Sequence, residues 1–184
     1  MPMLILLDRD GVLNEDRNPG VTSPGELVLL PGAPEAVARL NAAGHKVALI
    51  TNQSVVGRGI IPPAMLETIH GHLREGLAAK GAHLDLILAC TDPPWAATER
   101  RKPRPGMLRE AMQHFRERPE NAIMVGDALR DMEAAAEAGC RRILVRTGKG
   151  RATQASGLPA HVMPVAVYEN LSEAADAIVN GRVT

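Results

Sequence analysis

Five short aliphatic segments alternate with longer amphipathic segments along this chain of 184 residues. The aliphatic segments are rich in Val, Ile and Leu without regular polar alternation, which indicates strands that are buried on both faces. The expected strands span residues 4–7, 46–51, 84–89, 122–125 and 142–145. This alternation predicts an α/β fold with a doubly wound, Rossmann-like, mostly parallel sheet between two helical layers, a three-layer α/β/α arrangement.

Signals for helix ends lie between these strands. Segments 33–43, 63–79, 107–118 and 129–138 carry Ala, Leu, Met, Glu and Arg at helical spacing. Gly44, Gly81 and Gly139 follow three of them, where glycine commonly ends a helix, and Pro63 and Pro105 stand where two begin. A weaker strand at 162–167 and a helix at 172–179 are expected to complete one edge of the sheet.

Length and composition narrow the possible partners. A chain of this length fits one core, so residues 1–184 are expected to form a single domain without a separate cap domain. Its 21 basic and 21 acidic side chains cancel, and aromatic residues make up 2% of the chain, so we expect no nucleic-acid partner. No apolar run approaches the roughly 20 residues of a membrane span, and we expect a cytoplasmic monomer that does not bind membranes.

Two longer irregular stretches, residues 11–31 and 91–106, each follow a predicted strand directly. Long loops in a compact domain are usually functional or disordered. Both loops should leave the carboxyl edge of the sheet, where open α/β folds bind their ligands. We therefore look for the functional residues at this edge.

Two acidic residues, Asp8 and Asp10, follow the first strand, and Gly11 comes next. Side chains two positions apart on an extended chain share a face, and glycine lets the backbone turn away, so both carboxylates can point toward one site. Acid-rich turns of this kind also occur simply as loop caps or solvated loops. A calcium loop of the EF-hand type is excluded, because its glycine would be sixth from the first acid and Gly11 is fourth from Asp8.

Neutral and basic hydrogen-bond donors follow the second and third strands. Thr51 and Asn52 end the second strand and offer a hydroxyl, an amide and free backbone N–H groups suited to phosphate oxygens. Arg101 and Lys102 precede a helix, where the helix dipole favours acidic residues instead. Each pattern alone is also compatible with an ordinary solvated turn, so its meaning depends on what lies beside it in the fold.

Asp127 ends the fourth strand. The first and fourth strands can flank the switch point of a doubly wound sheet, so Asp8, Asp10 and Asp127 are expected to converge. Two carboxylates about 4 Å apart repel by roughly 4 kcal/mol at an effective dielectric near 20, so such a cluster needs a cation to stay ionised. Oxygen ligands with no thiolate or imidazole nearby favour Mg²⁺. Asp131 is expected to cap a helix or to contact Lys102 instead of binding the metal.

The succession of an acid pair, Thr-Asn, Lys and an acid at four strand tips resembles the four motifs of the haloacid dehalogenase-type phosphatases, over residues 4 to about 148. The amino-acid sequences of these motifs are most similar to those of one branch, the D-glycero-D-manno-heptose 1,7-bisphosphate 7-phosphatases and the related histidinol-phosphate phosphatases. The motifs that carry the resemblance are Asp-Arg-Asp-Gly-Val-Leu-Asn, Thr-Asn-Gln-Ser, Arg-Lys-Pro-Arg-Pro-Gly-Met and Val-Gly-Asp-Ala-Leu-Arg-Asp-Met.

The resemblance implies a role for each acidic residue in a single phosphatase domain. Asp8 would be the nucleophile that takes the phosphoryl group as an aspartyl-phosphate. Asp10 would protonate the leaving alkoxide and later deprotonate the attacking water. Mg²⁺ would be held by Asp8, by the backbone carbonyl of Asp10 and by Asp127.

It also implies how the phosphate is bound. Lys102, Thr51 and Asn52 would neutralise the oxygens of the transferring group together with the metal. Arg101, beside the lysine, would reach a second anionic group or a sugar hydroxyl of the substrate. The expected partner is therefore a small phosphorylated sugar.

The chain departs from this branch in the loop before the lysine motif. Members usually carry a zinc loop there, with a Cys-x-His pair and a later Cys-x-Cys pair. Here Cys90 holds the first place, but Asp92 stands where His would be, and residues 99–101 contain no thiol. Four-coordinate zinc cannot be built from what is left, so we expect no structural zinc. The shorter loop is expected to be stiffened by its Pro-Pro pair and pinned by Trp95.

Three readings of the function stay open at this point. The favoured one is a Mg²⁺-dependent phosphatase, with heptose 1,7-bisphosphate as the first substrate to test and histidinol phosphate or another small sugar phosphate as the alternative. A phosphoacceptor domain for signalling is a second class, although such domains usually place the accepting Asp after the third strand, which here ends in Ala-Cys-Thr. A binding protein that has lost activity is the third.

Overall fold

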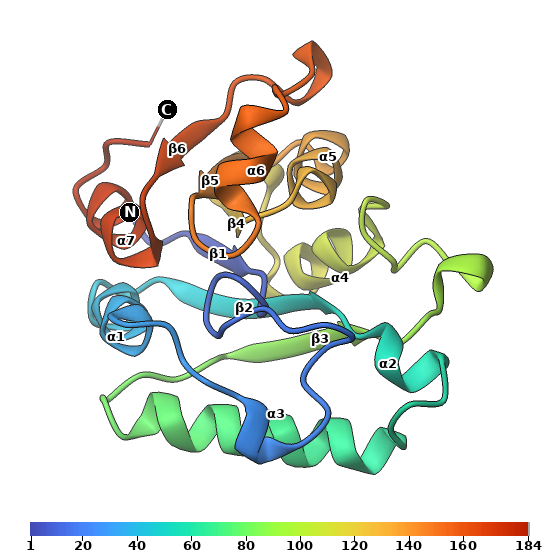
Figure 1. Cartoon of the computed structure of the whole chain (residues 1–184). Coiled ribbons are helices and arrows are strands. Elements are labelled where there is room, and N and C mark those ends of the chain that lie inside the picture. Colours follow the sequence, from blue (N-terminus) through green and yellow to red (C-terminus); the bar gives the residue numbers. More distant parts are fainter. Residues whose placement is uncertain (184) are drawn as a thin grey trace.

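The computed structural model, which describes residues 1–183, contains a six-stranded parallel sheet in the order β3-β2-β1-β4-β5-β6 (Figure 1). The strands are β1 (Leu4–Leu7), β2 (Lys46–Asn52), β3 (Leu86–Cys90), β4 (Ala122–Gly126), β5 (Arg141–Val145) and β6 (Ala166–Tyr168). β1 pairs with β2 on one side and with β4 on the other, all in parallel. The doubly wound α/β prediction is therefore confirmed.

Helices cover both faces of the sheet (Figure 1). They are α1 (Ala33–Ala42), α2 (Ser54–Gly57), α3 (Pro63–Ala78), α4 (Gly106–Phe115), α5 (Leu129–Ala138), α6 (Gly150–Ala155) and α7 (Leu171–Val179). Short 3-10 helices also occur between these elements, at Pro24–Glu26, Pro94–Ala96, Pro119–Asn121 and Ala160–Val162. None of the helices in the described part of the chain is long and apolar enough to cross a membrane.

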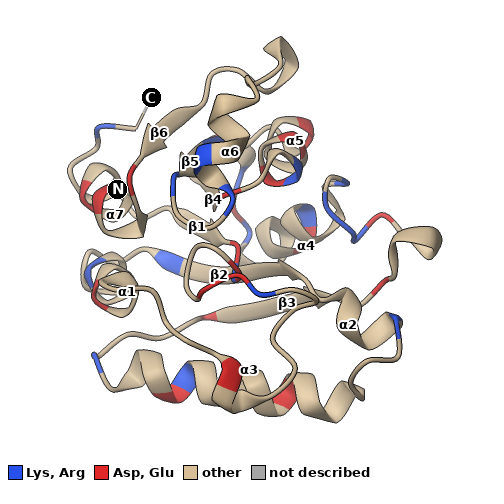
Figure 2. Ribbon diagram, in the orientation of Figure 1, with Lys and Arg blue, Asp and Glu red and all other residues tan. Residues whose placement is uncertain are grey.

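The strands are aliphatic throughout because each face of the sheet has its own core. Ile5 and Leu7 of β1 pack into the core that α1, α3 and α7 cover. Leu4 and Leu6 of the same strand pack on the opposite face, against α4 and α5. Charged residues lie mainly on helices and loops, and the strands are mostly free of them (Figure 2).

The predicted elements are found, with shifts at their ends. The third strand begins at Leu86 and not at residue 84, and the helix expected to reach residue 118 ends at Phe115, because Arg116 adopts a left-handed conformation with φ 57°. Residues 162–167 were expected to be a strand. That prediction was wrong in part, since a 3-10 turn occupies Ala160–Val162 and β6 begins at Ala166.

Candidate active site

Asp8 and Asp127 each follow the last residue of a central strand, β1 and β4. These strands are neighbours with Leu7 opposite Val125, and Asp8 N donates to Val125 O at 3.0 Å. β1 also pairs with β2 on its other side, so the chain reverses its winding direction here and the tips of the two strands border the switch point. The sheet itself therefore brings these two carboxylates together, as the sequence predicts.

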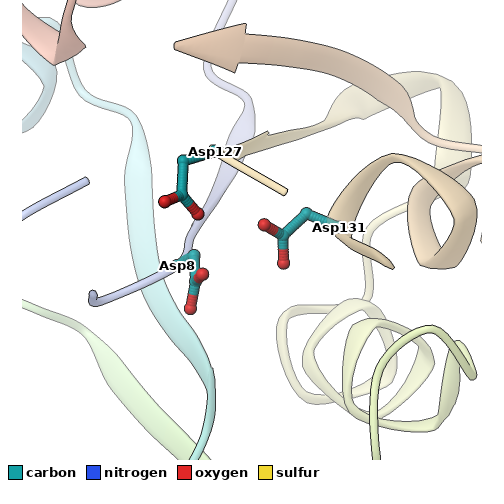
Figure 3. Close-up of side chains that lie close together, drawn as sticks. All are labelled: Asp8, Asp127 and Asp131. Atoms are coloured by element: carbon teal, nitrogen blue, oxygen red, sulfur yellow. The ribbon is translucent and has the colours of Figure 1, made fainter. Parts of the chain in front are cut away.

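Asp131, from the first turn of α5, completes a cluster of three buried carboxylates (Figure 3). One ligand oxygen from each of Asp8, Asp127 and Asp131 lies within 4.8 Å of the others. Burial, followed by repulsion from neighbouring carboxylates, raises the pKa of Asp8 to about 6 and that of Asp127 to about 7. The cluster is therefore a site where positive charge is needed.

Glycines leave the room that these carboxylates occupy. Gly11 has φ +81°, and a Cβ there would lie 2.0 Å from Asp127 Oδ2. Gly126 directly precedes Asp127, and a Cβ on it would lie 2.4 Å from Asp131 Oδ2. Since real contacts of this kind never come below 3.0 Å, any larger residue at these positions would displace a carboxylate.

Lys102 provides a fixed positive charge beside the cluster. Its side chain is fully buried, and Nζ lies 3.0 Å from Asp8 Oδ1, 2.7 Å from Asp131 Oδ1 and 2.8 Å from the carbonyl oxygen of Ile50. Burial alone would lower the pKa of Lys102, but the carboxylates of Asp131 and Asp8 outweigh it and raise the pKa. The lysine is therefore held as an ammonium.

The predicted contact between Asp131 and Lys102 is confirmed by this ion pair. The second oxygen of Asp131 accepts from Ala128 N at 3.1 Å, so the same side chain also caps the start of α5, which was the other expectation. Because both oxygens have partners, Asp131 is the least available of the three carboxylates as a metal ligand.

Asn52 and Thr51 end β2 beside the lysine. The Asn52 side chain donates to Lys102 O at 3.0 Å and accepts from Lys102 N at 3.1 Å, so it fixes the backbone that carries the lysine. Thr51 is fully buried and accepts from Gln53 Nε2 at 2.9 Å. Both residues lie at the expected edge of the sheet.

Asp10 lies outside the three-carboxylate cluster, with its side chain 18% exposed. Its Oδ1 accepts from Asn14 Nδ2 at 2.9 Å and from Arg9 Nη2 at 3.1 Å, while Oδ2 accepts from Gln53 Nε2 at 2.9 Å. Burial would raise the pKa of Asp10, but Arg9 and the amide donors outweigh it and lower the pKa. The prediction that the side chain of Asp10 converges with those of Asp8 and Asp127 was therefore wrong. Its backbone lies two residues after Asp8.

A cavity of about 490 Å³ opens beside Asp10 and Asn52. Four cationic side chains line it, from four different segments: Arg17, Arg101, Arg130 and Lys149. Asp16 also lines it, with Oδ2 3.4 Å from Lys149 Nζ, so the cations outnumber the carboxylates of Asp10 and Asp16 by two. Arg101, the only one that the sequence singled out, also donates to the carbonyl oxygen of Asp92 at 2.8 Å. Arg130 lies within the motif around Asp127 but was given no role there, and Arg17 and Lys149 lie outside the four motifs, so it is the fold that brings these cations together.

The loop between β3 and the lysine is held by Asp92. Its Oδ2 accepts from Thr98 N at 2.8 Å and from Thr98 Oγ1 at 2.6 Å, which closes the loop on itself. Trp95, which was expected to pin this loop, is 74% exposed, so the loop is not held by burial of its ring. The Asp92 carboxylate, at the position where the related branch usually carries a histidine, holds the loop through hydrogen bonds.

Relatives of known name match most of the chain. The heptose-1,7-bisphosphate 7-phosphatase of Bordetella bronchiseptica is 45% identical over 154 residues, 84% of this chain and 86% of the relative. That of Pseudomonas aeruginosa is 39% identical over 176 residues, 96% of this chain and 97% of the relative. This chain belongs to the haloacid dehalogenase-like phosphatases. The HAD-hydrolase-like family also matches residues 99–174.

Solved structures of this phosphatase family agree with the sequence relatives. The B. bronchiseptica D,D-heptose 1,7-bisphosphate phosphatase, complexed with magnesium and phosphate, superposes with a TM-score of 0.92 at 42% identity, covering 97% of this chain and 99% of that one. The enzyme from Burkholderia thailandensis has a TM-score of 0.75 at 36% identity, covering 96% and 98%. The same fold therefore holds magnesium and phosphate in a family member.

Proposed function

We propose that this phosphatase removes the 7-phosphate of D-glycero-D-manno-heptose 1,7-bisphosphate through an aspartyl-phosphate on Asp8. The observation that carries the proposal is the position of the Asp8 carboxylate at the switch point, between the Lys102 ammonium and Asp127. The names of the relatives, which include heptose bisphosphate phosphatases at 39–45% identity, support this substrate.

The residues present fit a Mg²⁺ ion. Three buried carboxylates gather within 4.8 Å, their donors are hard oxygens, and their mutual repulsion calls for a cation. Asp8, Asp127 and the backbone carbonyl of Asp10 would hold the ion. When bound, it supplies positive charge to the oxygens of the transferring phosphoryl group.

Asp8 is the nucleophile in this proposal. Its Oδ1 accepts from Arg9 N at 2.8 Å and from Lys102 Nζ at 3.0 Å, which fixes the plane of the carboxylate. Within the described part of the chain no donor contacts Oδ2, so this oxygen is the one that attacks phosphorus. The bond from Asp8 to phosphorus forms as the bond from phosphorus to the sugar oxygen breaks.

Asp10 handles the proton in both steps. The negative charge of a bound phosphate ester would raise the pKa of Asp10 from its lowered value in the free protein, so that its carboxyl group can protonate the departing sugar alkoxide in the first step. In the second step its carboxylate accepts a proton from the water that attacks phosphorus. The second step breaks the bond to Asp8 and releases phosphate. Lys102, Thr51 and Asn52 would stabilise the phosphoryl oxygens.

The cationic cavity supports a substrate with a second anionic group. Arg17, Arg101, Arg130 and Lys149 line it beside the proposed acid-base residue, Asp10. A sugar bisphosphate places its second phosphate on these cations, whereas histidinol phosphate would bring an ammonium toward them. Like charges repel, so the cavity favours the bisphosphate over histidinol phosphate.

We further propose that residues 1–184 act as one phosphatase domain, as a monomer in the cytoplasm. Light scattering should give the mass of one chain, 19.6 kDa. Twice this mass at micromolar concentration would contradict the monomer.

Phosphate release with Mg²⁺ tests the function. Heptose 1,7-bisphosphate should turn over at least about 10-fold more efficiently than heptose 7-phosphate or histidinol phosphate, since charged contacts contribute 1–3 kcal/mol each. Arg130→Ala should narrow the difference in kcat/KM between the two heptose phosphates.

Asp8→Asn is the matched inactive control, and activity above about 1% of the wild type would refute the assignment of Asp8 as the nucleophile. No release from any phosphate ester, with a long-lived phosphorylated protein, would instead favour the signalling class.

A further inference from the structure

The Arg9 guanidinium lies directly behind Asp10 and is completely buried. Its Nη2 donates to Asp10 Oδ1 at 3.1 Å and to Gln53 Oε1 at 3.1 Å. Nε reaches the same oxygen of Asp10 at 3.4 Å. One planar group therefore contacts both the proposed acid-base residue and the amide that holds its other oxygen.

The remaining arm of Arg9 ends on a histidine. Nη1 lies 3.1 Å from Nε2 of His70, a residue of α3 that is 4% exposed and 61 positions away in the sequence. A guanidinium can only donate, so Nε2 of His70 must be the acceptor and cannot carry a proton. Burial, then the charge of Arg9, lowers the pKa of His70 to about 4, in agreement with a neutral ring.

The orientation of Asp10 depends on this arm. A planar guanidinium that is bound along one edge can still tilt about that edge, and a buried N–H without a partner would be costly. The acceptor from α3 fixes the far end of the plane. The edge that meets Asp10 is then fixed as well, and with it the carboxylate that must line up with the leaving oxygen.

We propose that His70 is a positioning residue for the reaction, acting through Arg9 to orient Asp10. This inference rests on the proposed function, since it needs Asp10 to transfer protons. His70 contacts no substrate in this role. The alternative is that His70 only fills the interior between α3 and the sheet.

Two substrates with different leaving groups distinguish a positioning role of His70 from a role in packing alone. A sugar alkoxide needs a proton as it departs, so a misplaced acid slows its departure. Nitrophenolate departs without a proton, so the first chemical step with p-nitrophenyl phosphate does not need the acid. Because kcat/KM covers only the steps through the first irreversible one, it reports this difference directly.

The variants should include one that keeps the acceptor. In His70→Gln, the side-chain oxygen can stand where Nε2 stands, whereas His70→Leu removes the acceptor and keeps an apolar residue of similar size. The matched control is His72→Leu, on the same helix, where the side chain is 50% exposed. Circular dichroism and melting curves verify that each variant folds.

The expected result is selective. His70→Leu should lower kcat/KM for heptose 1,7-bisphosphate about 100-fold, within the range of a lost general acid, and change that for p-nitrophenyl phosphate less than about 3-fold. The loss should appear in kcat and not in KM. His70→Gln should recover most of the activity, and His72→Leu should match the wild type.

Equal losses on both substrates, or a Gln variant as impaired as the Leu variant, would overturn the proposal. If His70→Leu does not fold, the ratio of kcat/KM for the two substrates in His70→Met decides, because this variant also lacks the acceptor for Arg9 Nη1 and a role in packing alone predicts an unchanged ratio. An inactive wild type would refute the proposed function itself. An active wild type with unselective His70 variants would refute only the positioning role.

Discussion

The Lys102 ammonium lies 2.7 Å from Asp131 Oδ1, and both side chains are fully buried. This pair places a permanent positive charge at the tip of β1, 3.0 Å from the carboxylate of Asp8. Removing one member of a buried ion pair leaves the other charge uncompensated, and the free-energy cost can be several kcal/mol. The contact is therefore both a stability element and part of the phosphate site.

Lys102→Met should lower the unfolding free energy by about 3 kcal/mol and reduce kcat by at least about 1000-fold, because two buried carboxylates lose their cation. Lys102→Met combined with Asp131→Leu should recover part of the stability but none of the activity. Urea unfolding and phosphate release measure the two effects. Recovery of both together would contradict the role of the lysine in binding phosphate.

Mg²⁺ should stabilise the wild type, because the ion relieves repulsion between carboxylates that the fold forces together. At 100 times its Kd the gain should be about 2.7 kcal/mol. Asp127→Asn should melt at a higher temperature than the wild type without metal and should lose the response to Mg²⁺. Scanning calorimetry of both proteins at increasing Mg²⁺ concentration would measure both effects. A variant that still responds fully to Mg²⁺ would place the ion elsewhere.

Gly126→Ala should reduce activity by at least about 100-fold, since its new Cβ would collide with Asp131 at 2.4 Å and displace the partner of Lys102. The matched control is Gly71→Ala on α3, where nothing lies within 4 Å of the added Cβ. That substitution should raise stability by about 0.5–1 kcal/mol, because alanine favours helix, and leave activity unchanged. Wild-type activity in Gly126→Ala would show that the carboxylate tolerates displacement.

His70 should contribute measurably to the pH dependence of the unfolding free energy. Its pKa lies near 6.5 in the unfolded chain and about 4 in the folded protein, so between these values the unfolded state binds more protons. The contribution of His70 is therefore fully present above about pH 6.5 and is lost as the pH falls toward 4, by about 3 kcal/mol at most.

His70→Gln should make the unfolding free energy fall less steeply between pH 6.5 and 4 than it does in the wild type. Other titrating groups act equally in both proteins, so the difference between the two curves isolates this residue. His114→Gln, at an exposed position of α4, should follow the wild-type curve. Parallel curves for His70→Gln and wild type would mean that folding does not lower the pKa of His70, and would contradict a neutral ring held by burial and Arg9.

The sequence predicted the parts of the site that a strand tip determines. Asp8 and Asp127 follow buried strands, and parallel neighbours bring their carboxyl ends to one edge, so their convergence needs only the strand order. Lys102 follows from the same reasoning combined with the motif spacing. The packing of the sheet was equally accessible, because the unbroken aliphatic strands required helices on both faces.

The remaining parts depend on contacts between distant segments. The contact of Arg9 with His70 joins β1 to α3, and nothing in the local sequence distinguishes a buried arginine from a solvated one. Arg130 and Lys149 enter the cavity because α5 and the loop before α6 converge there. The loop after β3 is closed by hydrogen bonds from Thr98 to Asp92, a contact within the loop that the sequence pattern did not single out.

The most direct test of the account is acid quenching during turnover of heptose 1,7-bisphosphate with Mg²⁺, followed by peptide mapping of the protein. We predict a phosphoryl group on the peptide of β1, localised to Asp8, that forms before phosphate is released and disappears when substrate is exhausted. Phosphate release at the same rate with no phosphorylated Asp8 at any time would contradict the central claim.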